Sequence, residues 1–356
     1  MKCYAPTSQH VARGHTLSQI IGLFYGPSTL SSEISFDRPV SSLSFSLAFR
    51  RSSLNDWHRD ISLFGLSFWP EFMTQLFSSF RRLGSVRSYA KQLRIDGVKD
   101  IIAVASGKGG VGKSTTSVNL AVALASKCQL KVGLLDADVY GPNIPTMMGI
   151  NRKPEVTEEK KMIPIEKYGI KCMSIGFLVE KDAPIVWRGP MVANALEKMT
   201  RGVDWGNLDI LVVDMPPGTG DTQIVMSQNL QLSGAVIVST PQDVALMDAR
   251  RGLKMFNKVD VPILGIVENM SCFKCPHCGE PSYIFGKGGT HKTAAEMGVE
   301  FLGEISLEVE IREDCDQGVP IVLSRPDSAV TKAYSGLAQK IAHKLKEQPR
   351  QPEITL

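Results

Sequence analysis

The sequence lacks an apolar run long enough to cross a bilayer, which takes about 20 residues. The best candidate, residues 61–80, is interrupted by Pro70 and Glu71, so we expect no transmembrane segment. The sequence also lacks an even set of cysteines for a secreted disulfide framework, because it has seven, and three of these lie within residues 272–278. A reducing compartment fits this pattern better.

Positive charge is scarce outside the N-terminal segment. The net charge is +4, but residues 1–94 hold 11 Lys and Arg against 5 Asp and Glu, which leaves 29 against 31 for the remainder. The remainder is therefore slightly acidic, and we expect no nucleic-acid partner. With 43% hydrophobic and 21% charged residues, the chain has an ordinary globular composition, which excludes fibrous, collagen-like and wholly disordered classes.

Residues 1–94 contain no long hydrophobic period of 2.0 or 3.6 residues, so we expect a disordered leader without a packed core. The end of the leader, from Met73 onward, has several serines and no acid before Asp96. Its basic residues are Arg81, Arg82, Arg87, Lys91 and Arg94. Such a stretch can form the basic amphipathic helix of a mitochondrial transit peptide, and a disordered basic tail is the alternative.

A transit peptide predicts a location in the mitochondrial matrix. Arg87-Ser88-Tyr89-Ala90 also resembles a matrix-protease cleavage context. Because a transit peptide begins at the N-terminus of a chain, residues 1–72 do not fit this interpretation, and we hypothesise that translation starts at Met73. Peptides from before Met73 in the endogenous protein would reject that hypothesis.

Behind the leader, short apolar runs alternate with helical stretches. Uniformly apolar strands separated by helices favour an α/β fold of three layers, with a mainly parallel sheet covered on both faces. We expect one domain over residues 95–346 and a polar tail over 347–356. The predicted strands are 101–105, 132–135, 210–213, 235–239, 263–267 and 301–305. The predicted helices include 114–126, 222–229, 244–257 and 329–346.

The strongest motif lies between the predicted strand IIAVA and the helical TTSVNLAVALA, and it runs Gly107-Lys108-Gly109-Gly110-Val111-Gly112-Lys113-Ser114. This is the spacing and the strand–loop–helix context of a nucleotide-binding P-loop. Its glycines let the backbone wrap around phosphates, so that N–H groups and the helix N-terminus meet the negative charge. We expect Lys113 to neutralise the β and γ phosphates, Ser114 to bind Mg²⁺, and Thr115 to belong to the same nucleotide-binding loop. A turn that merely joins a strand to a helix is the alternative.

Lys108, directly after the first glycine, is unusual for a P-loop. The run SGKGGVGKST resembles the deviant Walker A loop of the ParA, MinD and nitrogenase iron protein class. The resemblance implies that Lys108 crosses a homodimer interface and contacts the partner's nucleotide, where it would supply the positive charge that an arginine finger supplies elsewhere. A solvated loop lysine is the alternative.

Two acidic motifs follow apolar strands, where carboxylates face the crevice in which α/β sheets bind ligands. The first, LLDADVYGP, places Asp136 near magnesium and Asp138 where the same class has a switch I acid that orients water. The second, LVVDMPPGTGD, is typical of a Walker B strand ending in Asp214, with a switch loop behind it. Each Asp alone is equally typical of a loop or a helix cap. With the P-loop, we expect Lys108, Lys113, Asp138 and Asp214 to form a hydrolytic site.

Asn269 directly follows the predicted strand ILGIVE. In the class that the P-loop resembles, this position reads the edge of adenine, which implies that the nucleotide is ATP. An Asn that only forms a turn at a strand end is the alternative.

The loop SCFKCPHCG supplies Cys275 and Cys278 at the C-x-x-C spacing that lets two sulfurs converge on one soft ion. A zinc site or a four-iron cluster normally takes four protein ligands, and no separate C-x-x-C lies outside this loop. The count therefore points to one site shared by two chains. The alternatives are a zinc knuckle completed by Cys272 and His277, a redox pair, and two free thiols. Against the redox pair, the residues after Cys278 do not begin a helix.

The remaining isolated cysteines are expected to be buried small hydrophobic residues, and these are Cys128, Cys172 and Cys315. Trp187 to Pro190 is a further candidate for contact with a partner chain.

Together with IVWRGPM, STPQDVALMDA and the IFG after the cysteines, these motifs resemble the Mrp/ApbC-type iron-sulfur carrier P-loop ATPases over residues 95–345. The resemblance implies a homodimer that binds ATP and Mg²⁺, holds a [4Fe-4S] cluster through Cys275 and Cys278 of each chain, and passes it to apo iron-sulfur proteins. With the leader, it implies a mitochondrial member that supports assembly of respiratory complex I, with complex I subunits as partners. The extra Cys272 and the long N-terminal segment depart from the family pattern.

We therefore expect a nucleotide-gated carrier with weak ATPase activity. A ParA-like or MinD-like spatial regulator would instead associate with DNA or membranes, and the slightly acidic domain and the mixed 329–346 helix disfavour it. A zinc-stabilised ATPase without cluster transfer and a plain ATP-dependent enzyme are further alternatives, and the sequence shows no second catalytic constellation for the latter.

Overall fold

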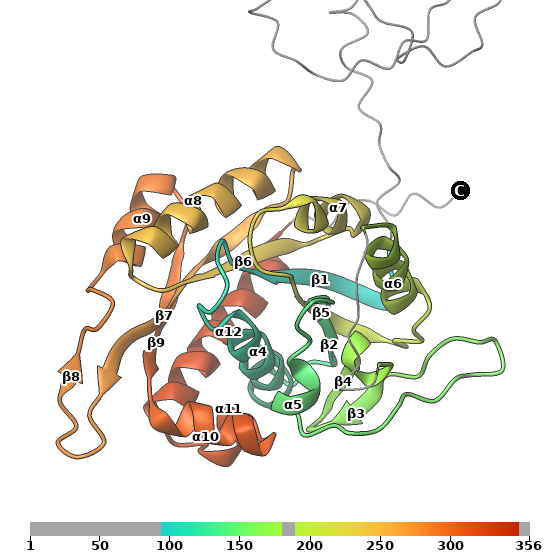
Figure 1. The fold of residues 1–356 in the computed structure, drawn as a ribbon, viewed down its shortest axis with the longest axis horizontal. Helices are drawn as coiled ribbons and strands as arrows, with labels where there is room; N and C mark the ends of the chain where they lie inside the picture. Colours follow the sequence, from blue (N-terminus) through green and yellow to red (C-terminus); the bar gives the residue numbers. More distant parts are fainter. Residues whose placement is uncertain (1–93, 180–188, 349–356) are drawn as a thin grey trace, which may run out of the picture. The chain divides into compact units, whose positions relative to one another are not determined.

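A computed structural model describes residues 94–179 and 189–348 of the chain. The predicted leader up to residue 93, Trp187 and Arg188, and most of the predicted polar tail lie outside the described residues. Within these ranges the chain forms a nine-stranded sheet with helices on both faces (Figure 1).

The strand order across the sheet is β3-β4-β2-β5-β1-β6-β7-β8, and β9 pairs with β7. The pairings are parallel except for β3 with β4 and β7 with β8, which are antiparallel. The strands are β1 (Val98–Ala105), β2 (Val132–Asp136), β3 (Ile165–Lys167), β4 (Ile170–Ser174), β5 (Leu208–Asp214), β6 (Gly234–Ser239), β7 (Ile263–Lys274), β8 (Pro281–Ser282) and β9 (Phe301–Leu307).

The central strands are buried on both faces because their sequences are apolar without alternation. Every residue of β2 (VGLLD) and of β6 (GAVIVS) is buried. Val and Ile fit the pleated surface of such strands, and helices supply the cover that a parallel sheet needs on each side.

Two helix layers cover the sheet (Figure 1). On one face α4 packs against α12, and on the other α8 packs against α9 and α7. The helices are α4 (Lys113–Cys128), α5 (Ile144–Met147), α6 (Gly189–Arg201), α7 (Asp221–Asn229), α8 (Asp243–Lys258), α9 (Gly289–Met297), α10 (Val309–Gln317), α11 (Ile321–Ser324) and α12 (Ala329–Glu347), with a 3₁₀ turn η2 (Ile175–Phe177). The largest buried side chains include Trp205, Phe256 and Tyr334.

The six predicted strands and four predicted helices are confirmed, with ends that shift by a few residues. One strand differs more: β7 was predicted over 263–267 and extends to Lys274. The prediction did not name three strands and five helices, which are β3, β4, β8, α5, α6, α9, α10 and α11. The α10 sequence VEIREDCDQ has little apolar character, so its hydrophobic pattern alone does not indicate a helix.

Candidate nucleotide site and cysteine hairpin

The P-loop connects β1 to α4 through a backbone that requires glycine. Gly110 and Gly112 have φ angles of +80° and +82°, in the left-handed region that favours glycine. Gly107 lies so close to α8 that an added Cβ would be 2.2 Å from the carbonyl carbon of Asp248. The loop therefore fits closely between the sheet and α8, with Lys108 and Gly109 exposed to solvent.

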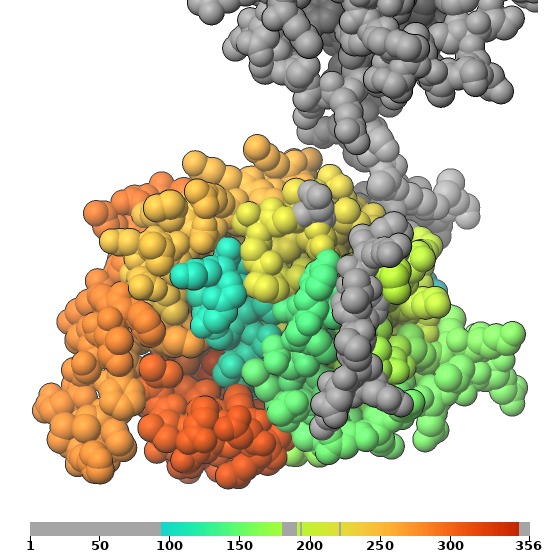
Figure 2. Space-filling model, in the orientation of Figure 1, coloured from blue at the N-terminus to red at the C-terminus, as the bar shows by residue number. Residues whose placement is uncertain are grey.

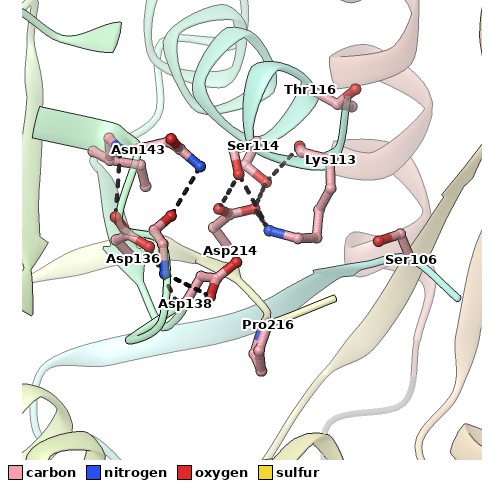
Figure 3. Close-up of polar contacts among 12 residues, drawn as sticks. Ser106, Lys113, Ser114, Thr116, Asp136, Asp138, Asn143, Asp214 and Pro216 are labelled. Atoms are coloured by element: carbon pink, nitrogen blue, oxygen red, sulfur yellow. Dashed lines mark hydrogen bonds and ion pairs between the residues drawn. The ribbon is translucent and has the colours of Figure 1, made fainter. Parts of the chain in front are cut away.

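Asp214, at the end of β5, is bound to the first turn of α4 (Figure 3). Its Oδ1 accepts from Nζ of Lys113 at 2.9 Å, and its Oδ2 accepts from Oγ of Ser114 at 2.6 Å. Ser117, one turn further along α4, donates to Oδ1 at 2.6 Å. The structure thus joins the P-loop to the strand that the sequence predicted as Walker B.

Asp136, at the end of β2, is fully buried, and its Oδ2 accepts from Oγ of Ser174 at 2.9 Å and from the backbone N–H of Ile144 at 3.3 Å. Burial, and secondly the charge of Asp214, raise the pKa of Asp136 to about 8. A bound cation would oppose both effects, so this carboxyl and the Ser114 hydroxyl suit a hard, oxygen-binding ion such as Mg²⁺.

Asp138 is nearly buried in the turn after β2, and its Oδ1 accepts from the backbone N–H of Gly141 at 3.3 Å. Burial also raises the pKa of Asp138, while the charge of Lys113 lowers it. Figure 3 shows Asp136, Asp138 and Asp214 around one end of α4. The sequence therefore located the acids that the fold brings together.

Asn269, on β7, contacts the P-loop directly. Its Nδ2 donates to the carbonyl of Val111 at 2.8 Å, and its side chain is buried. The neighbouring Glu268 is buried too, and its Oε2 accepts from the backbone N–H of Thr290 at 3.1 Å, at the start of α9. The middle of β7 therefore lies between the P-loop and the start of α9. Gly289 packs closely beside the end of β6, because an added Cβ would lie 2.6 Å from the carbonyl oxygen of Pro241.

Cys275 and Cys278 lie in a tight hairpin between β7 and β8. The backbone N–H of Cys275 donates to the carbonyl of Glu280 at 3.1 Å, and that of Gly279 donates to the carbonyl of Cys275 at 2.9 Å. The Cys275 side chain is half-buried and that of Cys278 is exposed. Backbone N–H groups of Cys278 and His277 at the sulfur lower the pKa of the Cys275 thiol, which favours the thiolate that binds metals.

The other cysteines differ from this pair. Burial raises the pKa of Cys172 to about 12 and that of Cys315 to about 11. The prediction of buried thiols is confirmed for Cys172, but Cys128 and Cys315 are half-buried. The first helix after Cys278 is α9, from Gly289 onward, so the hairpin has no adjacent helix N-terminus of the thioredoxin kind.

Sequence reasoning missed the side chains that support the acids. Ser117 and Ser174 donate to Asp214 and Asp136, and Gln223 donates to the carbonyl of Pro216 behind the Walker B strand. Ser117 is three residues after Ser114, a spacing that places both on one helix face and could have indicated it. Ser174 comes from β4, and no sequence motif connects it to Asp136.

The described residues contain no group of three or more His, Cys, Asp or Glu side chains placed to hold a metal ion. None of the helices within 94–179 and 189–348 is both long and apolar enough to span a membrane.

A strand, P-loop and helix whose Lys and Ser contact an Asp at the end of a parallel strand define a P-loop NTPase. The family model described as "ParA: NUBPL iron-transfer P-loop NTPase" matches residues 97–342, and the chain belongs to this family. The predicted family resemblance and the predicted fold, of the ParA and MinD type, are both confirmed.

Named relatives are similar over most of their length. The "Iron-sulfur protein required for NADH dehydrogenase, mitochondrial" of Arabidopsis thaliana is 71% identical over 262 residues, which are 74% of this chain and 84% of that protein. The "Iron-sulfur cluster transfer protein NUBPL" of Mus musculus is 56% identical over 264 residues, 74% of this chain and 83% of that protein. The solved nucleotide-binding protein of Archaeoglobus fulgidus in complex with ADP is 40% identical, with a TM-score of 0.58 over 66% of this chain and 92% of that chain.

Proposed function

We propose that this protein is an ATP-binding iron-sulfur cluster carrier that delivers a [4Fe-4S] cluster to apoproteins. The observation that carries the proposal is that one fold holds both a buried P-loop site and an exposed C-x-x-C hairpin whose first thiol favours the thiolate. The printed names of two relatives support it: one is an iron-sulfur cluster transfer protein, and the other is an iron-sulfur protein required for NADH dehydrogenase.

The P-loop binds the phosphates of ATP through its backbone N–H groups and Lys113. When bound, Mg²⁺ would neutralise part of the charge of the phosphates. Ser114 and Asp136 would hold this ion, and Asp214 orients the Ser114 hydroxyl. Asp138 orients the attacking water, Lys108 acts on the nucleotide of a partner chain, and we propose slow hydrolysis from this set. The ADP in the solved relative supports nucleotide binding.

Asn269 contacts the adenine edge in this proposal. One N–H of its amide donates to the carbonyl of Val111, which leaves the second N–H and Oδ1 for the base, so Asn269 would link the base to the P-loop. Base recognition is then coupled to the conformation of the P-loop.

The cluster is cargo that needs two chains. Each hairpin supplies Cys275 and Cys278, a four-iron cluster takes four thiolates, and a homodimer brings the two pairs together. Both thiols lie in a turn that reaches solvent, which leaves them accessible to a second copy. Cys272 lies within β7, three residues before Cys275, and we propose that it is not a required ligand.

The relatives' names support a mitochondrial location, and we propose the matrix, with complex I subunits as recipients and translation from Met73. The tryptic peptides of the endogenous protein test the start.

Anaerobic reconstitution of the full chain with iron and sulfide tests the carrier proposal. We expect about two iron atoms per chain, which is one four-iron cluster per dimer. Cys275→Ser and Cys278→Ser should each abolish iron uptake and leave nucleotide binding intact, and Cys272→Ser is the matched control that should retain both. A monomer that retains zinc in place of iron would refute the proposal.

A further inference from the structure

A single strand, β7, leads from the nucleotide site to the cysteine hairpin. Asn269 in its middle donates to the P-loop carbonyl of Val111, and Lys274 at its end precedes Cys275. Figure 1 shows β7 running from beside β6 toward β8 at one edge of the sheet. A rigid path through β7 would therefore connect the nucleotide to the cysteine hairpin.

That path is interrupted by a bulge. Asn269 pairs with Ile305 of β9 and Phe273 pairs with Leu307, so β7 advances four residues where β9 advances two. The β7 bulge, residues 270–272, holds the excess chain. A bulge bends its strand and sets the direction of the residues beyond it, which here include Cys275 and Cys278.

Met270 fixes the conformation of this bulge. Its φ is +56°, a left-handed value that is strained for a residue with a Cβ and that glycine adopts freely. The left-handed region is small, so Met270 has little room to rotate. Its side chain also reaches the P-loop, because a Cβ added to Gly112 would lie 3.6 Å from Cε of Met270.

An ion pair and a hydrogen bond hold the end of β7 and the bulge in place. Beyond it, Nζ of Lys274 lies 2.7 Å from Oε1 of Glu308. Within it, Oγ of Ser271 donates to the carbonyl of Ile305 at 3.3 Å. The start of α9, which follows β8 in the chain, is attached next to Asn269 as well, because the backbone N–H of Thr290 donates to Oε2 of Glu268. A displacement at Asn269 therefore has a short, stiff route to the hairpin.

We propose that Met270 is a positioning residue, whose left-handed backbone makes the β7 bulge transmit nucleotide binding at Asn269 and the P-loop to Cys275 and Cys278. The proposal deepens the carrier function and rests on it, since it names the residue through which nucleotide regulates the cluster-binding thiols. A glycine at this position would keep the chain path and lose the stiffness. An alanine would keep the Cβ restriction and lose only the contact of the side chain.

The test measures alkylation of Cys275 and Cys278 by N-ethylmaleimide in the cluster-free full chain, by site-resolved mass spectrometry, with and without MgADP. We expect MgADP to change the rate about fivefold or more in the unaltered protein, the scale of a typical coupling between sites. At saturating MgADP, Met270→Gly should lose most of this ratio and Met270→Ala should retain it. Lys160→Gly is the matched control, because Lys160 also has a positive φ, +63°. Its loop, residues 157–161, lies across the domain from the cysteine hairpin (Figure 1 and Figure 2).

Two results would overturn the proposal: no effect of MgADP on the unaltered protein, or an undiminished effect in Met270→Gly. A loss of the effect in Met270→Ala equal to that in Met270→Gly would also overturn it, because side-chain packing would then be the cause. Urea unfolding of each variant shows that the fold is kept. If the unaltered protein takes up no iron and sulfide, the carrier function is refuted, but the alkylation ratios are unaffected. Failure of the carrier function is therefore distinguishable from failure of the Met270 proposal.

Discussion

The ammonium group of Lys113 lies 2.9 Å from Oδ1 of Asp214, and the two side chains are only 6% and 1% exposed. A buried ion pair of this kind holds the P-loop to the Walker B strand. Asp214 also accepts hydrogen bonds from Ser114 and Ser117. Three side chains at the start of α4 therefore compensate its buried charge. The same contacts that organise the site therefore contribute to the stability of the domain.

Lys113→Ala should destabilise the protein by about 3–5 kcal/mol, because it leaves the Asp214 carboxylate buried without its charged partner. Urea unfolding measures this. The matched control is Lys99→Ala, which removes an ion pair with Asp209 in which the lysine is 64% exposed, and which should cost under about 1 kcal/mol. Equal losses in the two variants would contradict a structural role for the buried pair.

The pKa of Asp136 predicts how stability depends on pH. Its pKa is about 8 in the folded chain against 3.8 for the free side chain, so the folded state keeps a proton that the unfolded state releases. The stability that this proton gives is full below about pH 4 and is lost as the pH rises through about 8. Without nucleotide, the melting temperature should fall between pH 5 and 8.5, and Asp136→Asn should flatten that slope.

Asp209→Asn is the control for the pH series. Hydrogen bonds from Lys99 and from the backbone of Lys131 lower the pKa of Asp209, so its contribution is lost only at more acidic pH. Its substitution should leave the slope between pH 5 and 8.5 unchanged. If Asp136→Asn and Asp209→Asn change the pH dependence of the melting temperature by the same amount, the burial of Asp136 is not the cause of that dependence.

The sequence-based prediction succeeded for functional residues that lie together in short sequence motifs. The P-loop, the Asp214 strand and the cysteine pair each lie within about ten consecutive residues, and the alternation of apolar runs with helical stretches gives the parallel sheet. The fold assembles these motifs at the carboxyl ends of the strands, as expected.

The prediction failed for residues whose conformation or neighbours are set by tertiary contacts. The second half of β7 contains Asn269, Ser271 and Lys274, which are poor strand formers, and its pairing with β9 and β8 holds it extended. The left-handed Met270 has no sequence signal, since nothing in NMSC distinguishes it from a regular strand residue. Ser174 is likewise brought to Asp136 only by the pairing of β2 with β4.

Cys275 should be the most reactive of the described thiols that have shifted pKa values. Hydrogen bonds from Cys278 and His277 lower its pKa, whereas burial raises that of Cys172 to about 12. At pH 7 we expect alkylation of Cys275 by iodoacetamide to be faster than that of Cys172 by on the order of 10² or more. Mass spectrometry of timed samples measures both, and Cys172 should react at a comparable rate only after unfolding in urea. Similar rates in the folded protein would contradict the assigned environments.

Gly107→Ala should destabilise the contact between the P-loop and α8, because the new Cβ would lie 2.2 Å from the carbonyl carbon of Asp248. Gly109→Ala is the matched control, since its Cβ would meet its nearest atom, in Pro217, only at 4.0 Å. Thermal unfolding without nucleotide should show a loss of several degrees for Gly107→Ala and little change for Gly109→Ala. A reversed order would mean that the loop does not pack as described.

Complementation of cells that lack the endogenous protein tests the carrier account most directly. Complex I activity is measured after expression of the unaltered chain, of the double variant Cys275→Ser/Cys278→Ser, and of the control Cys172→Ser. The account predicts that the unaltered chain and Cys172→Ser restore the activity and that the double variant does not, although it still binds nucleotide. Restoration by the double variant would contradict it.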